Sequence, residues 1–477
     1  MIRIEGQPIL TAAQMRAAEE RAIAAGSSVQ DLMERAGAGV AEAVRRLAAG
    51  APVLVLCGPG NNGGDGYVAA RILRANGVDV RAAVSGDPKS AAAIEAHARW
   101  NGPTEPLLTA SPAPVLVDAL FGTGLARALD TEIAKALGWL ISGARLSIAV
   151  DLPSHVATDT GEVFNHDAIR PVDLTLTLGA VKPAHLLMPS AEYCGAVRLI
   201  DIGVDPRSVD TERQLPLVID KPEFLQPTQD SHKYSRGLVI VIAGRMPGAA
   251  HLAAKAAAHA GAGYVMLLGD DPGPTALPDA IVRRDWDVGA LNAMVVNKAN
   301  VVIVIGPGLG RDDEARSKLA AAIATGRELV IDGDALHLLD DAAFANFAKR
   351  DWRDSVFMTP HAGEFNAAFG TWSGSKIDAA RAAAERAHAT IVFKGPDTVI
   401  AGRDGSATVT PPGSKWLSTA GSGDVLAGTM AAAICSIAHG DDGAAAVWLH
   451  AEAARRLGGA FIADDLAREL SVVRASL

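Results

Sequence analysis

Residues 421–424, Gly-Ser-Gly-Asp, combine a glycine-rich turn with a carboxylate, and an alanine-rich apolar run over residues 425–437 follows them. The run predicts a helix that begins in this turn. Uncovered backbone N–H groups and the helix dipole together favour a bound anion at such a place. Asp424, in the first helical turn, would either cap the helix or take a proton from a hydroxyl group beside a phosphate.

A second glycine-rich stretch, residues 58–66 (Gly-Pro-Gly-Asn-Asn-Gly-Gly-Asp-Gly), follows an apolar run over residues 52–57. The run predicts a buried parallel strand, and residues 67–76 predict the next helix, so that this part begins a Rossmann-like unit. The spacing differs from the Gly-x-Gly-x-x-Gly of dinucleotide-binding folds. Five glycines with Asn61, Asn62 and Asp65 exceed what a tight turn needs. They suit a ligand with phosphates and hydroxyls, or a cation held by oxygen.

Polar side chains also lie at the ends of the strands expected at residues 114–118 and 147–150. Asp118 is the last residue of the first of these strands, and Asp151 and Ser154 follow the second. Because ligands bind at the carboxyl ends of parallel strands, these residues and Asn62 belong to one candidate site. All offer oxygen, which suits a hard or alkali cation better than zinc.

The first half resembles the NAD(P)H-hydrate epimerase family over residues 10–205. The matching motifs are residues 58–66, 118–124 (Asp-Ala-Leu-Phe-Gly-Thr-Gly), and 149–154 (Ala-Val-Asp-Leu-Pro-Ser) with Thr160-Gly161 after them. The resemblance implies epimerisation of a nicotinamide ring hydroxylated at C6, with a potassium ion held by Asn62, Asp118 and Ser154. It implies substrate contacts from Asn61, Asn62, Gly63, Gly64, Asp65, Gly122, Thr123, Gly124, Leu125, Ala126, Arg127, Ala128 and Asp151.

Proton transfer in the first half is assigned to Asp151 and Lys182. Lys182, in Leu-Gly-Ala-Val-Lys-Pro, matches a lysine near the family's site, and two opposed proton carriers suit an epimerisation. One residue departs from the family pattern: His155 stands where glycine usually follows the serine. The imidazole would either crowd the pocket or point away from it.

In the second half, the strands expected at residues 238–243, 264–268, 301–305, 329–331, 356–359 and 390–393 each run into a turn that contains glycine or a polar residue. This half resembles the ribokinase-like superfamily and, within it, the ADP- or ATP-dependent NAD(P)H-hydrate dehydratases, over residues 230–475. The resemblance rests on Lys233 and on residues 246–250 (Met-Pro-Gly-Ala-Ala), 306–310 (Gly-Pro-Gly-Leu-Gly), 359–364 (Thr-Pro-His-Ala-Gly-Glu), 394–398 (Lys-Gly-Pro-Asp-Thr) and 421–424.

The second resemblance implies two groups of contacts. Adenine-nucleotide contacts are assigned to Lys394, Gly395, Pro396, Asp397, Thr398 and Gly423. Contacts to the hydrate are assigned to Ala250 (or its neighbour Ala249), Gly308, His361 and Asp424. With Asp424 as the base, phosphoryl transfer to the ring hydroxyl would create a leaving group, and elimination would restore the dihydronicotinamide. His361 has an alternative as a histidine that caps a turn, and Glu364 would hold magnesium through water or cap the next helix.

Composition excludes several classes of protein. The 477 residues are 49% hydrophobic and 21% charged, which fits a globular α/β protein of more than one domain. A net charge of −10 and 4% aromatic residues disfavour a nucleic-acid partner. No apolar run reaches membrane-spanning length. Three scattered cysteines without metal spacing favour a reduced, cytoplasmic protein. We also expect a homo-oligomer.

The sequence therefore predicts a Rossmann-like parallel sheet in residues 1–210 and a ribokinase-like α/β/α sandwich in residues 225–477, with the proline-bearing residues 205–231 as the linker. The predicted function is repair of NADH and NADPH hydrates: epimerisation of the R and S forms, then dehydration of the S form with magnesium and ADP or ATP. Two alternatives stay open. One is a ribokinase-like kinase for a small alcohol, and the other is a non-catalytic first half that serves dimerisation or binding.

Overall fold

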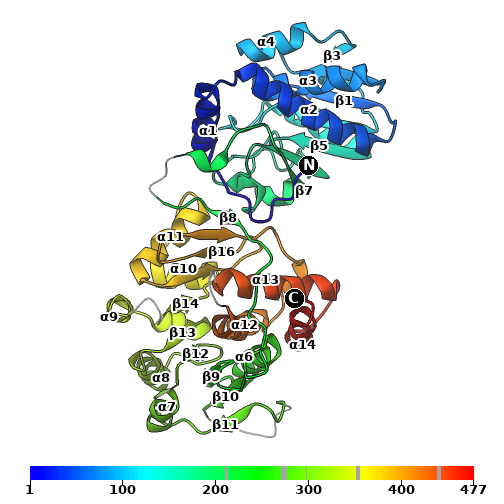
Figure 1. Ribbon diagram of the computed structural model, residues 1–477. Coiled ribbons are helices and arrows are strands. Elements are labelled where there is room, and N and C mark those ends of the chain that lie inside the picture. Colours follow the sequence, from blue (N-terminus) through cyan, green and yellow to red (C-terminus); the bar gives the residue numbers. More distant parts are fainter. Residues whose placement is uncertain (210–212, 270–276, 297, 351–354, 438–441) are drawn as a thin grey trace. The chain divides into compact units, whose positions relative to one another are not determined.

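Seven strands of the first half form one parallel sheet in the order β3-β2-β1-β4-β5-β6-β7 (Figure 1). The structure, a computed structural model, describes residues 1–209, 213–269, 277–296, 298–350, 355–437 and 442–477. It divides into two compact units, Met1–Val218 and Ile219–Leu477. The strands of the first unit are β1 (Val53–Cys57), β2 (Val80–Val84), β3 (Thr104–Pro106), β4 (Val115–Ala119), β5 (Leu146–Val150), β6 (Leu174–Leu178) and β7 (Ala196–Ile200).

Both faces of this sheet are covered, which is why its strands read as continuous apolar runs. Along β1, Val53 and Val55 belong to one hydrophobic cluster and Leu54 and Leu56 to another. The first cluster includes side chains of α1 (Ala12–Ala24), α2 (Val29–Ala48), α3 (Asn61–Ala75) and α4 (Ala91–Ala98), and the second includes those of α5 (Thr131–Gly143). Thr11 and Ser28 cap the first two helices, each with a capping box.

Helix α3 begins at Asn61, six residues earlier than the sequence indicates. The glycines permit close packing at this point: a Cβ on Gly63 would lie 1.9 Å from the Gly58 carbonyl oxygen, and one on Gly66 would lie 2.8 Å from the Cβ of Ala119. The expected loop is therefore the first turn of a helix whose backbone lies against the strand ends. Its N-terminal N–H groups point into the region where ligands of such sheets bind.

The second unit contains a larger mixed sheet, whose strands follow the order β11-β10-β9-β12-β13-β14-β15-β16-β17. Pairing is parallel from β11 to β15 and antiparallel between β15, β16 and β17. The strands of this unit are β9 (Leu238–Ile242), β10 (Tyr264–Leu268), β11 (Val282–Arg284), β12 (Val301–Ile305), β13 (Glu328–Ile331), β14 (Val356–Met358), β15 (Thr390–Phe393), β16 (Val399–Ala401) and β17 (Ala407–Val409). The short strand β8 (Leu217–Val218), in the predicted linker, ends the first unit.

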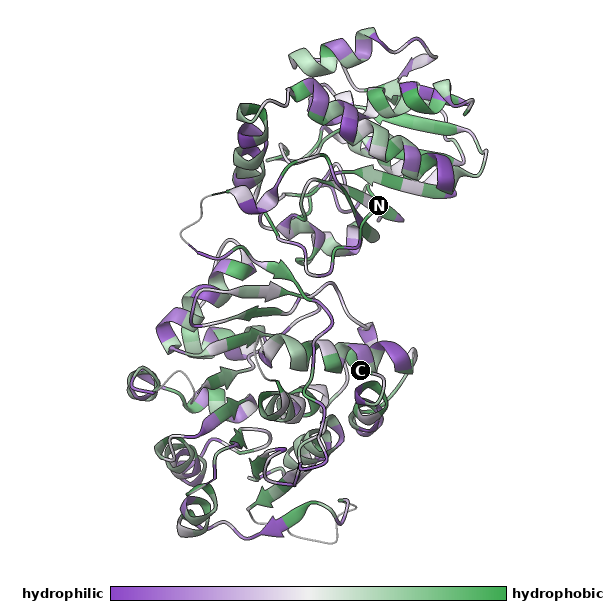
Figure 2. Cartoon of the chain, in the orientation of Figure 1, coloured by the Kyte–Doolittle hydropathy of each residue, from purple (hydrophilic) through white to green (hydrophobic). Residues whose placement is uncertain are grey.

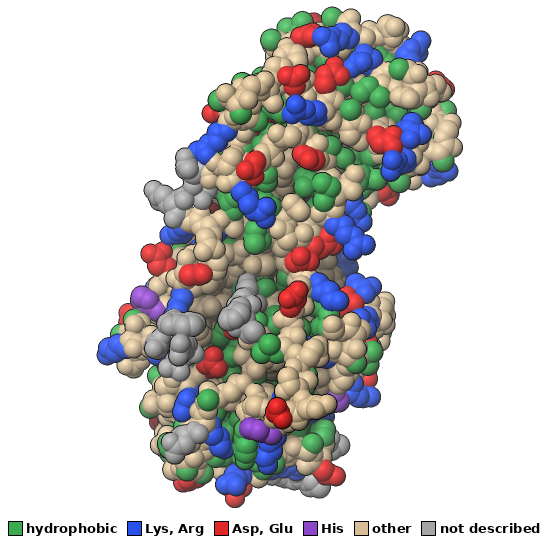
Figure 3. Space-filling model, in the orientation of Figure 1, with side chains coloured by type: hydrophobic (Ala, Val, Ile, Leu, Met, Phe, Trp, Pro, Cys, Tyr) green, Lys and Arg blue, Asp and Glu red, His purple; other side chains and the backbone are tan. Residues whose placement is uncertain are grey.

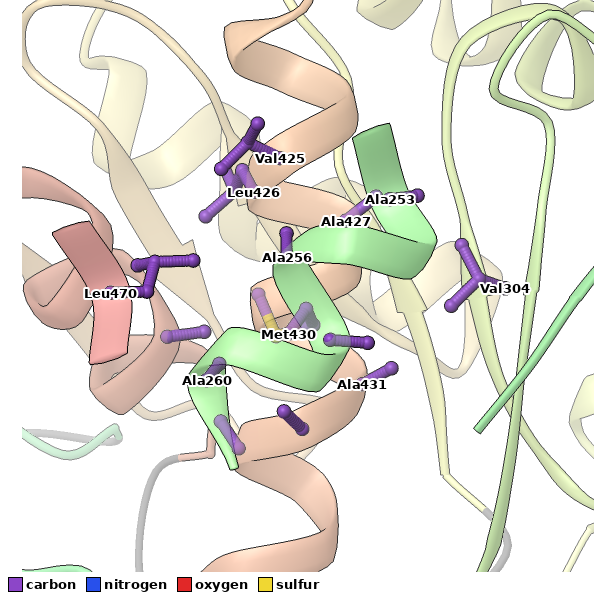
Figure 4. Close-up of a cluster of buried hydrophobic side chains, with 14 of the residues drawn as sticks. Ala253, Ala256, Ala260, Val304, Val425, Leu426, Ala427, Met430, Ala431 and Leu470 are labelled. Atoms are coloured by element: carbon purple, nitrogen blue, oxygen red, sulfur yellow. The ribbon is translucent and has the colours of Figure 1, made fainter. Parts of the chain in front are cut away.

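Helices cover this sheet on both sides (Figure 1). One layer consists of α6 (Pro247–Ala260), α12 (Ser422–Ser436), α13 (Asp442–Leu457) and α14 (Ala463–Arg474), and the other of α7 (Val288–Val295), α8 (Asp313–Ala324), α9 (Asp341–Phe347), α10 (Ala362–Phe369) and α11 (Lys376–Ala387). Alanines let α6 and α12 approach closely around Met430 (Figure 4). The predicted α/β class and α/β/α sandwich are confirmed.

Hydrophobic residues follow the strands in both units, whereas purple, hydrophilic positions lie on the helices and loops around them (Figure 2). Positive and negative side chains are interspersed on the face shown in Figure 3, without a basic stripe. In the described part of the chain, no helix is both long and apolar enough to cross a bilayer.

Two candidate active sites

The first unit contains a cavity of about 760 Å³. Its walls include residues that follow β1, β4 and β5, and the sheet order reverses between β1 and β4. Such a switch point is where open parallel sheets bind ligands. The charged and polar lining residues are Arg16, Glu19, Asn61, Asn62, Asp65, Lys89, Ser90, Thr123 and Asp151, among apolar side chains of α1, α2 and the 120–125 loop.

Asp151 and Lys182 form a buried ion pair between Oδ1 and Nζ. The Lys182 side chain is 1% exposed and does not line the cavity, whereas Asp151 does. Asp151 has a φ of +67°, in the left-handed region that costs most residues about 1–2 kcal/mol. That conformation turns the carboxylate at the end of β5 toward both the lysine and the cavity. The two groups are therefore a contact pair on one side of the cavity, and the expectation of two opposed proton carriers is wrong in its geometry.

His185 and Thr177 hold this ion pair in place. Lys182 Nζ donates to Thr177 Oγ1 at 3.2 Å and to the Leu178 carbonyl at 2.7 Å. The Lys182 backbone N–H donates to Nδ1 of His185 at 2.9 Å, so Nε2 carries the proton and donates to the Asp151 carbonyl at 2.7 Å. Burial and the Lys182 charge lower the pKa of His185 to about 4, which keeps the ring neutral in this arrangement.

Two further carboxyl groups line the cavity without a hydrogen bond or ion pair to any residue in the described ranges. Asp65 comes from the first turn of α3 and Glu19 from α1. Burial, together with the Asp151 and Glu19 charges, raises the pKa of Asp65 well above its usual value. Burial is also the largest cause of the raised pKa of Glu19, and the Lys182 charge opposes it. Both groups are thus biased toward the protonated, proton-donating form.

The predicted potassium ligands lie together at the ends of β1, β4 and β5. Ser154 Oγ donates to Asp118 Oδ1 at 2.7 Å, and the Ser154 N–H donates to Oδ2 at 3.1 Å. The amide nitrogen of Asn62 is buried without a partner among the described residues. Rotation of this amide would place its oxygen there instead. The donors are oxygens, so the residues present fit an alkali cation, which would also offset the burial that raises the pKa of Asp118.

His155 points away from the cavity. It is 1% exposed, is absent from the cavity wall, and packs edge-on against Tyr193 at 4.9 Å between ring centroids. Its φ lies outside the left-handed region, so this position does not require glycine. Of the two expectations for His155, the structure supports the one in which the ring leaves the pocket open.

In the second unit, the predicted glycine turn opens α12, with Gly421 as N-cap at a φ of +89°. No side chain caps this helix, and Asp424 makes no hydrogen bond within the described residues. A Cβ on Gly423 would lie 3.4 Å from Lys394 Nζ and 3.9 Å from Asp332 Oδ2. The N-terminal N–H groups of α12 and the lysine ammonium therefore lie close together, which makes this place a candidate anion site.

Lys394 is held by carboxylates. Its Nζ lies 2.7 Å from Asp332 Oδ1 and 3.6 Å from Glu364 Oε2, and Thr359 Oγ1 donates to the same Asp332 oxygen at 2.7 Å. The Lys394 side chain is 17% exposed and that of Asp332 is 4% exposed. Burial disfavours the ammonium, but the Asp332 and Glu364 charges outweigh it and raise the pKa of Lys394. The lysine stays charged and faces the turn.

Burial raises the pKa of Asp424 to about 6, and the Asp332 and Glu364 charges add to the shift while Lys394 opposes it. A carboxylate with a pKa near neutrality is a stronger base than an ordinary aspartate and is still ionised at pH 7. Among the described residues, no group of three His, Cys, Asp or Glu side chains could hold a metal ion.

Hydrogen bonds made by Lys376 and Thr398 hold the loop that follows β15. Lys376 Nζ contacts Asp397 Oδ1 at 2.6 Å and the Asp397 carbonyl at 3.0 Å, and Thr398 Oγ1 donates to the Gly395 carbonyl at 2.8 Å. These bonds leave Gly395 and Pro396 exposed at the surface of the loop. The predicted nucleotide-binding residues 394–398 thus form a strand-end loop, whose first residue, Lys394, faces the α12 turn.

Comparison with known proteins finds a family for each half of the chain. The family described as YjeF-related protein N-terminus matches residues 29–184, and the family described as NAD(P)H-hydrate dehydratase matches residues 239–473. A bifunctional NAD(P)H-hydrate repair enzyme of Thermofilum pendens is 34% identical over 85% of this chain and 83% of its own length. One of Coxiella burnetii is 32% identical over 96% of this chain and 98% of its own.

This chain belongs to the bifunctional NAD(P)H-hydrate repair enzyme family. The family predicted from the motifs is thereby confirmed. A crystal structure of ADP/ATP-dependent NAD(P)H-hydrate dehydratase from Bacillus subtilis, co-crystallized with ATP and Mg²⁺, is 25% identical and covers 53% of this chain and 94% of its own, with a TM-score of 0.46.

Some residues predicted to bind ligands in this repair enzyme family lie elsewhere. Gly63 and Gly64 are packing positions against Gly58 and Met33 and do not line the cavity. Residues 126–128 (Ala126, Arg127 and Ala128) are exposed outside it, whereas Gly122, Thr123, Gly124 and Leu125 form part of its wall.

Two predicted hydrate contacts of the second unit also need correction. Ala250 is 0% exposed in the hydrophobic core, so Ala249, partly exposed and 3.1 Å from a Cβ built on Gly308, is the better candidate for a contact. His361 caps α10: its Nδ1 accepts from the Gly363 N–H at 3.0 Å, and Glu364 completes a capping box. The capping alternatives for His361 and Glu364 therefore hold.

Several site residues of this repair enzyme were missed from the sequence. Asp332 directly follows a strand, as Asp151 does, so the pattern could have found it. His185 and Glu19 carry no such signal. His185 is three residues from Lys182 in a short 3₁₀ turn, and Glu19 is one of several glutamates on an ordinary helix.

Proposed function

We propose that the chain restores NADH and NADPH from their hydrates in two steps. The first unit interconverts the R and S hydrates. The second dehydrates the S hydrate with ADP or ATP, which gives AMP or ADP and phosphate. The observation that carries the proposal is that each unit presents a lysine–aspartate pair at the strand ends where a ligand would bind. We assign the two activities to residues 1–210 and 225–477.

In the first site, Asp151 is the charged group that meets the nicotinamide ring, and Lys182 acts through it. Asn61, Asn62, Asp65 and the loop from Gly122 surround the substrate. A Cβ on Gly122 would lie 3.1 Å from Asp151 Oδ2 and 3.2 Å from Asn62 Oδ1, so a side chain there would occupy the space between these two groups. Asp151 stabilises the positive charge that develops on the ring when the carbon–hydroxyl bond weakens.

Potassium held by Asn62, Asp118 and Ser154 would supply a fixed positive charge beside the substrate. The chain's own contribution is the orientation of those oxygens. The Phe121 N–H donates to Ser154 Oγ at 2.9 Å, which links the ion's ligands to the loop that leads into Gly122. An ion site that is coupled to this loop would order the cavity wall before the substrate binds.

In the second site, Asp424 takes the proton from the ring hydroxyl while the oxygen of that hydroxyl attacks the terminal phosphorus of the nucleotide. The bond to the leaving AMP or ADP breaks, and the N–H groups of α12 with Lys394 stabilise the transferring phosphoryl group. Gly423, Lys394 and the 395–398 loop, with Asp397 held by Lys376, position the nucleotide. The phosphate then leaves from the ring carbon, the neighbouring carbon loses a proton, and the dihydronicotinamide is restored.

The deciding experiment measures the return of dihydronicotinamide absorbance from a mixture of both hydrate epimers. Magnesium and potassium are present, and ADP or ATP is added separately. Complete recovery with one nucleotide supports both activities and identifies the phosphoryl donor. Recovery that stops when the S hydrate is consumed, apart from spontaneous epimerisation, would make the first unit a non-catalytic module. Absence of recovery with both nucleotides would refute the repair function and favour the kinase alternative.

Two expectations about the whole protein remain predictions. We expect a cytoplasmic homo-oligomer without a nucleic-acid or membrane partner. Sedimentation of the purified chain and its localisation in cells test these expectations separately from the enzymology.

A further inference from the structure

Helix α1 forms one wall of the first cavity although it lies outside the residues matched by the family, 29–184. Its side chains Met15, Arg16, Glu19 and Ile23 face the cavity. The helix is fixed at its start by a hydrogen bond of 2.8 Å from the Ala12 N–H to Asp159 Oδ1. The fold therefore holds the carboxyl group of Glu19 in the wall of the cavity that would bind the substrate.

We propose that Glu19 is the residue that exchanges a proton with the substrate's ring hydroxyl in the epimerisation. This inference rests on the proposed function of the first unit. Asp151 Oδ1 contacts both Lys182 Nζ and the Leu178 N–H, so this oxygen maintains the ion pair, and Oδ2 is the oxygen beside Gly122 of the cavity wall. The Lys182 side chain is buried by the ion pair and does not line the cavity. Glu19 lines the same cavity and has no partner among the described residues, so it is free to exchange a proton.

The Glu19 carboxyl gives its proton to the hydroxyl oxygen, the carbon–oxygen bond breaks with both electrons on oxygen, and water leaves. The lone pair of the ring nitrogen stabilises the resulting cation beside Asp151. Water then adds to the opposite face of the same carbon, and its surplus proton returns to a carboxylate of the cavity. No oxidant or further reactant is needed, and the same sequence runs in both directions.

The surroundings of Glu19 favour its protonated form. The charged groups that act on it are Lys182, Asp151, Arg16 and Glu20, and burial is the largest cause of its raised pKa. Asp65, from α3, also lines the cavity and has no hydrogen-bond partner among the described residues. An acid acts in the protonated form, so exchange of the epimers should fall as pH rises through the raised pKa of Glu19.

The test compares Glu19→Gln with Glu20→Gln in the full chain. Gln keeps the shape of Glu, and Glu20 is the exposed neighbour outside the cavity. We expect Glu19→Gln to lower kcat for epimer exchange by about 100-fold or more, with KM within threefold, and to remove the alkaline limb of the pH profile. Glu20→Gln should match the wild type. Dehydration of the S hydrate by the second unit serves as an internal measure of folded protein.

Three outcomes would overturn the inference: exchange by Glu19→Gln within threefold of the wild type, an equal loss in Glu20→Gln, or a rise in KM alone. Asp65→Asn decides between the two carboxyl groups. Loss of exchange in Asp65→Asn with a normal Glu19→Gln would assign the proton transfer to Asp65. If the wild-type chain itself fails to exchange the epimers, the proposed function of the first unit fails, which is a different result from an inactive variant of a working enzyme.

Discussion

The two candidate sites use the same pair of residue types in opposite orientations. In the first unit, Lys182 is 1% exposed and Asp151 is 10% exposed, so the carboxylate faces the cavity. In the second, Lys394 is 17% exposed and Asp332 is 4% exposed, so the ammonium faces the α12 turn. A site that must stabilise a cationic ring presents the anion, and a site that must bind phosphates presents the cation. The buried partner in each case keeps the presented charge in place.

The largest expected effect separates the two sites by their aspartates. Asp424→Asn should lower the dehydration rate by about 10²–10⁴-fold, because the base is lost, and should leave epimer exchange unchanged. Asp151→Asn should lower the rate of epimer exchange and leave the dehydration rate unchanged. In the wild type, the dehydration rate should fall as pH decreases through about 6, where Asp424 becomes protonated. Both reactions are followed in the same preparation by absorbance and by chromatography of the epimers.

Loss of both activities in either aspartate variant would contradict the assignment of one site to each unit. Unchanged exchange in Asp151→Asn would remove Asp151 from the reaction. The exposed aspartate Asp167 offers a control in the first unit, because Asp167→Asn alters the charge without touching the cavity.

The fold and most of the site could be predicted because the relevant signals are local. Continuous apolar runs identified the central strands, and glycine or polar residues at their ends identified the loops that meet at the switch points. The short strands β3, β11, β16 and β17 were missed, since three residues carry too little periodicity. The start of α3 was placed too late because glycine disfavours helices, whereas here its absent side chain permits contact with Gly58.

The burial of individual site residues could not be predicted. Whether Lys182 or Asp151 faces the cavity depends on the left-handed backbone of Asp151, which no sequence spacing reveals. Glu19 reaches the cavity through the packing of α1, a tertiary contact between residues that are distant in sequence. Ala250 and Ala249 are adjacent, and only the direction of α6 decides which one is exposed.

A moderate effect is expected from removal of each lysine. Lys182→Met leaves Asp151 without its partner in a buried place, and such losses cost about 3–5 kcal/mol of unfolding free energy. Lys394→Met should destabilise less, because Thr359 still donates to Asp332 and the site is more open. It should instead raise KM for the nucleotide. Urea unfolding and steady-state kinetics of both variants give this comparison.

The double variants Asp151→Asn/Lys182→Met and Asp332→Asn/Lys394→Met are the matched controls. Each removes both charges, so the stability lost in the first single variant should be partly regained in its double variant. Equal destabilisation by the two lysine variants, or a raised nucleotide KM in Lys182→Met, would contradict the opposite orientation of the two pairs.

The smallest effect on activity is expected at His155, the position where this chain departs from the family pattern. His155→Leu should leave epimer exchange within twofold, because the ring lies outside the cavity, yet it should change the acid stability. Burial lowers the pKa of His155 to about 4, below the 6.5 expected when the chain is unfolded. The unfolded chain therefore takes up the proton first, so the histidine costs stability as pH falls from 6.5 toward 4, by roughly 2–3 kcal/mol at pH 4.5.

The measurement for His155 is the difference in unfolding free energy of the first unit between pH 7.5 and 4.5. This difference should be smaller in His155→Leu than in the wild type by roughly 2–3 kcal/mol. A change in packing against Tyr193 alters the unfolding free energy equally at both pH values, so it cancels in the difference. His166→Leu, at an exposed histidine of the same unit, should keep the wild-type difference. His185 titrates in the same window and retains its own contribution, so the pH dependence should weaken without vanishing. Loss of epimer exchange by more than tenfold in His155→Leu would instead mean that the ring supports the cavity, and the family's glycine would then mark a functional position.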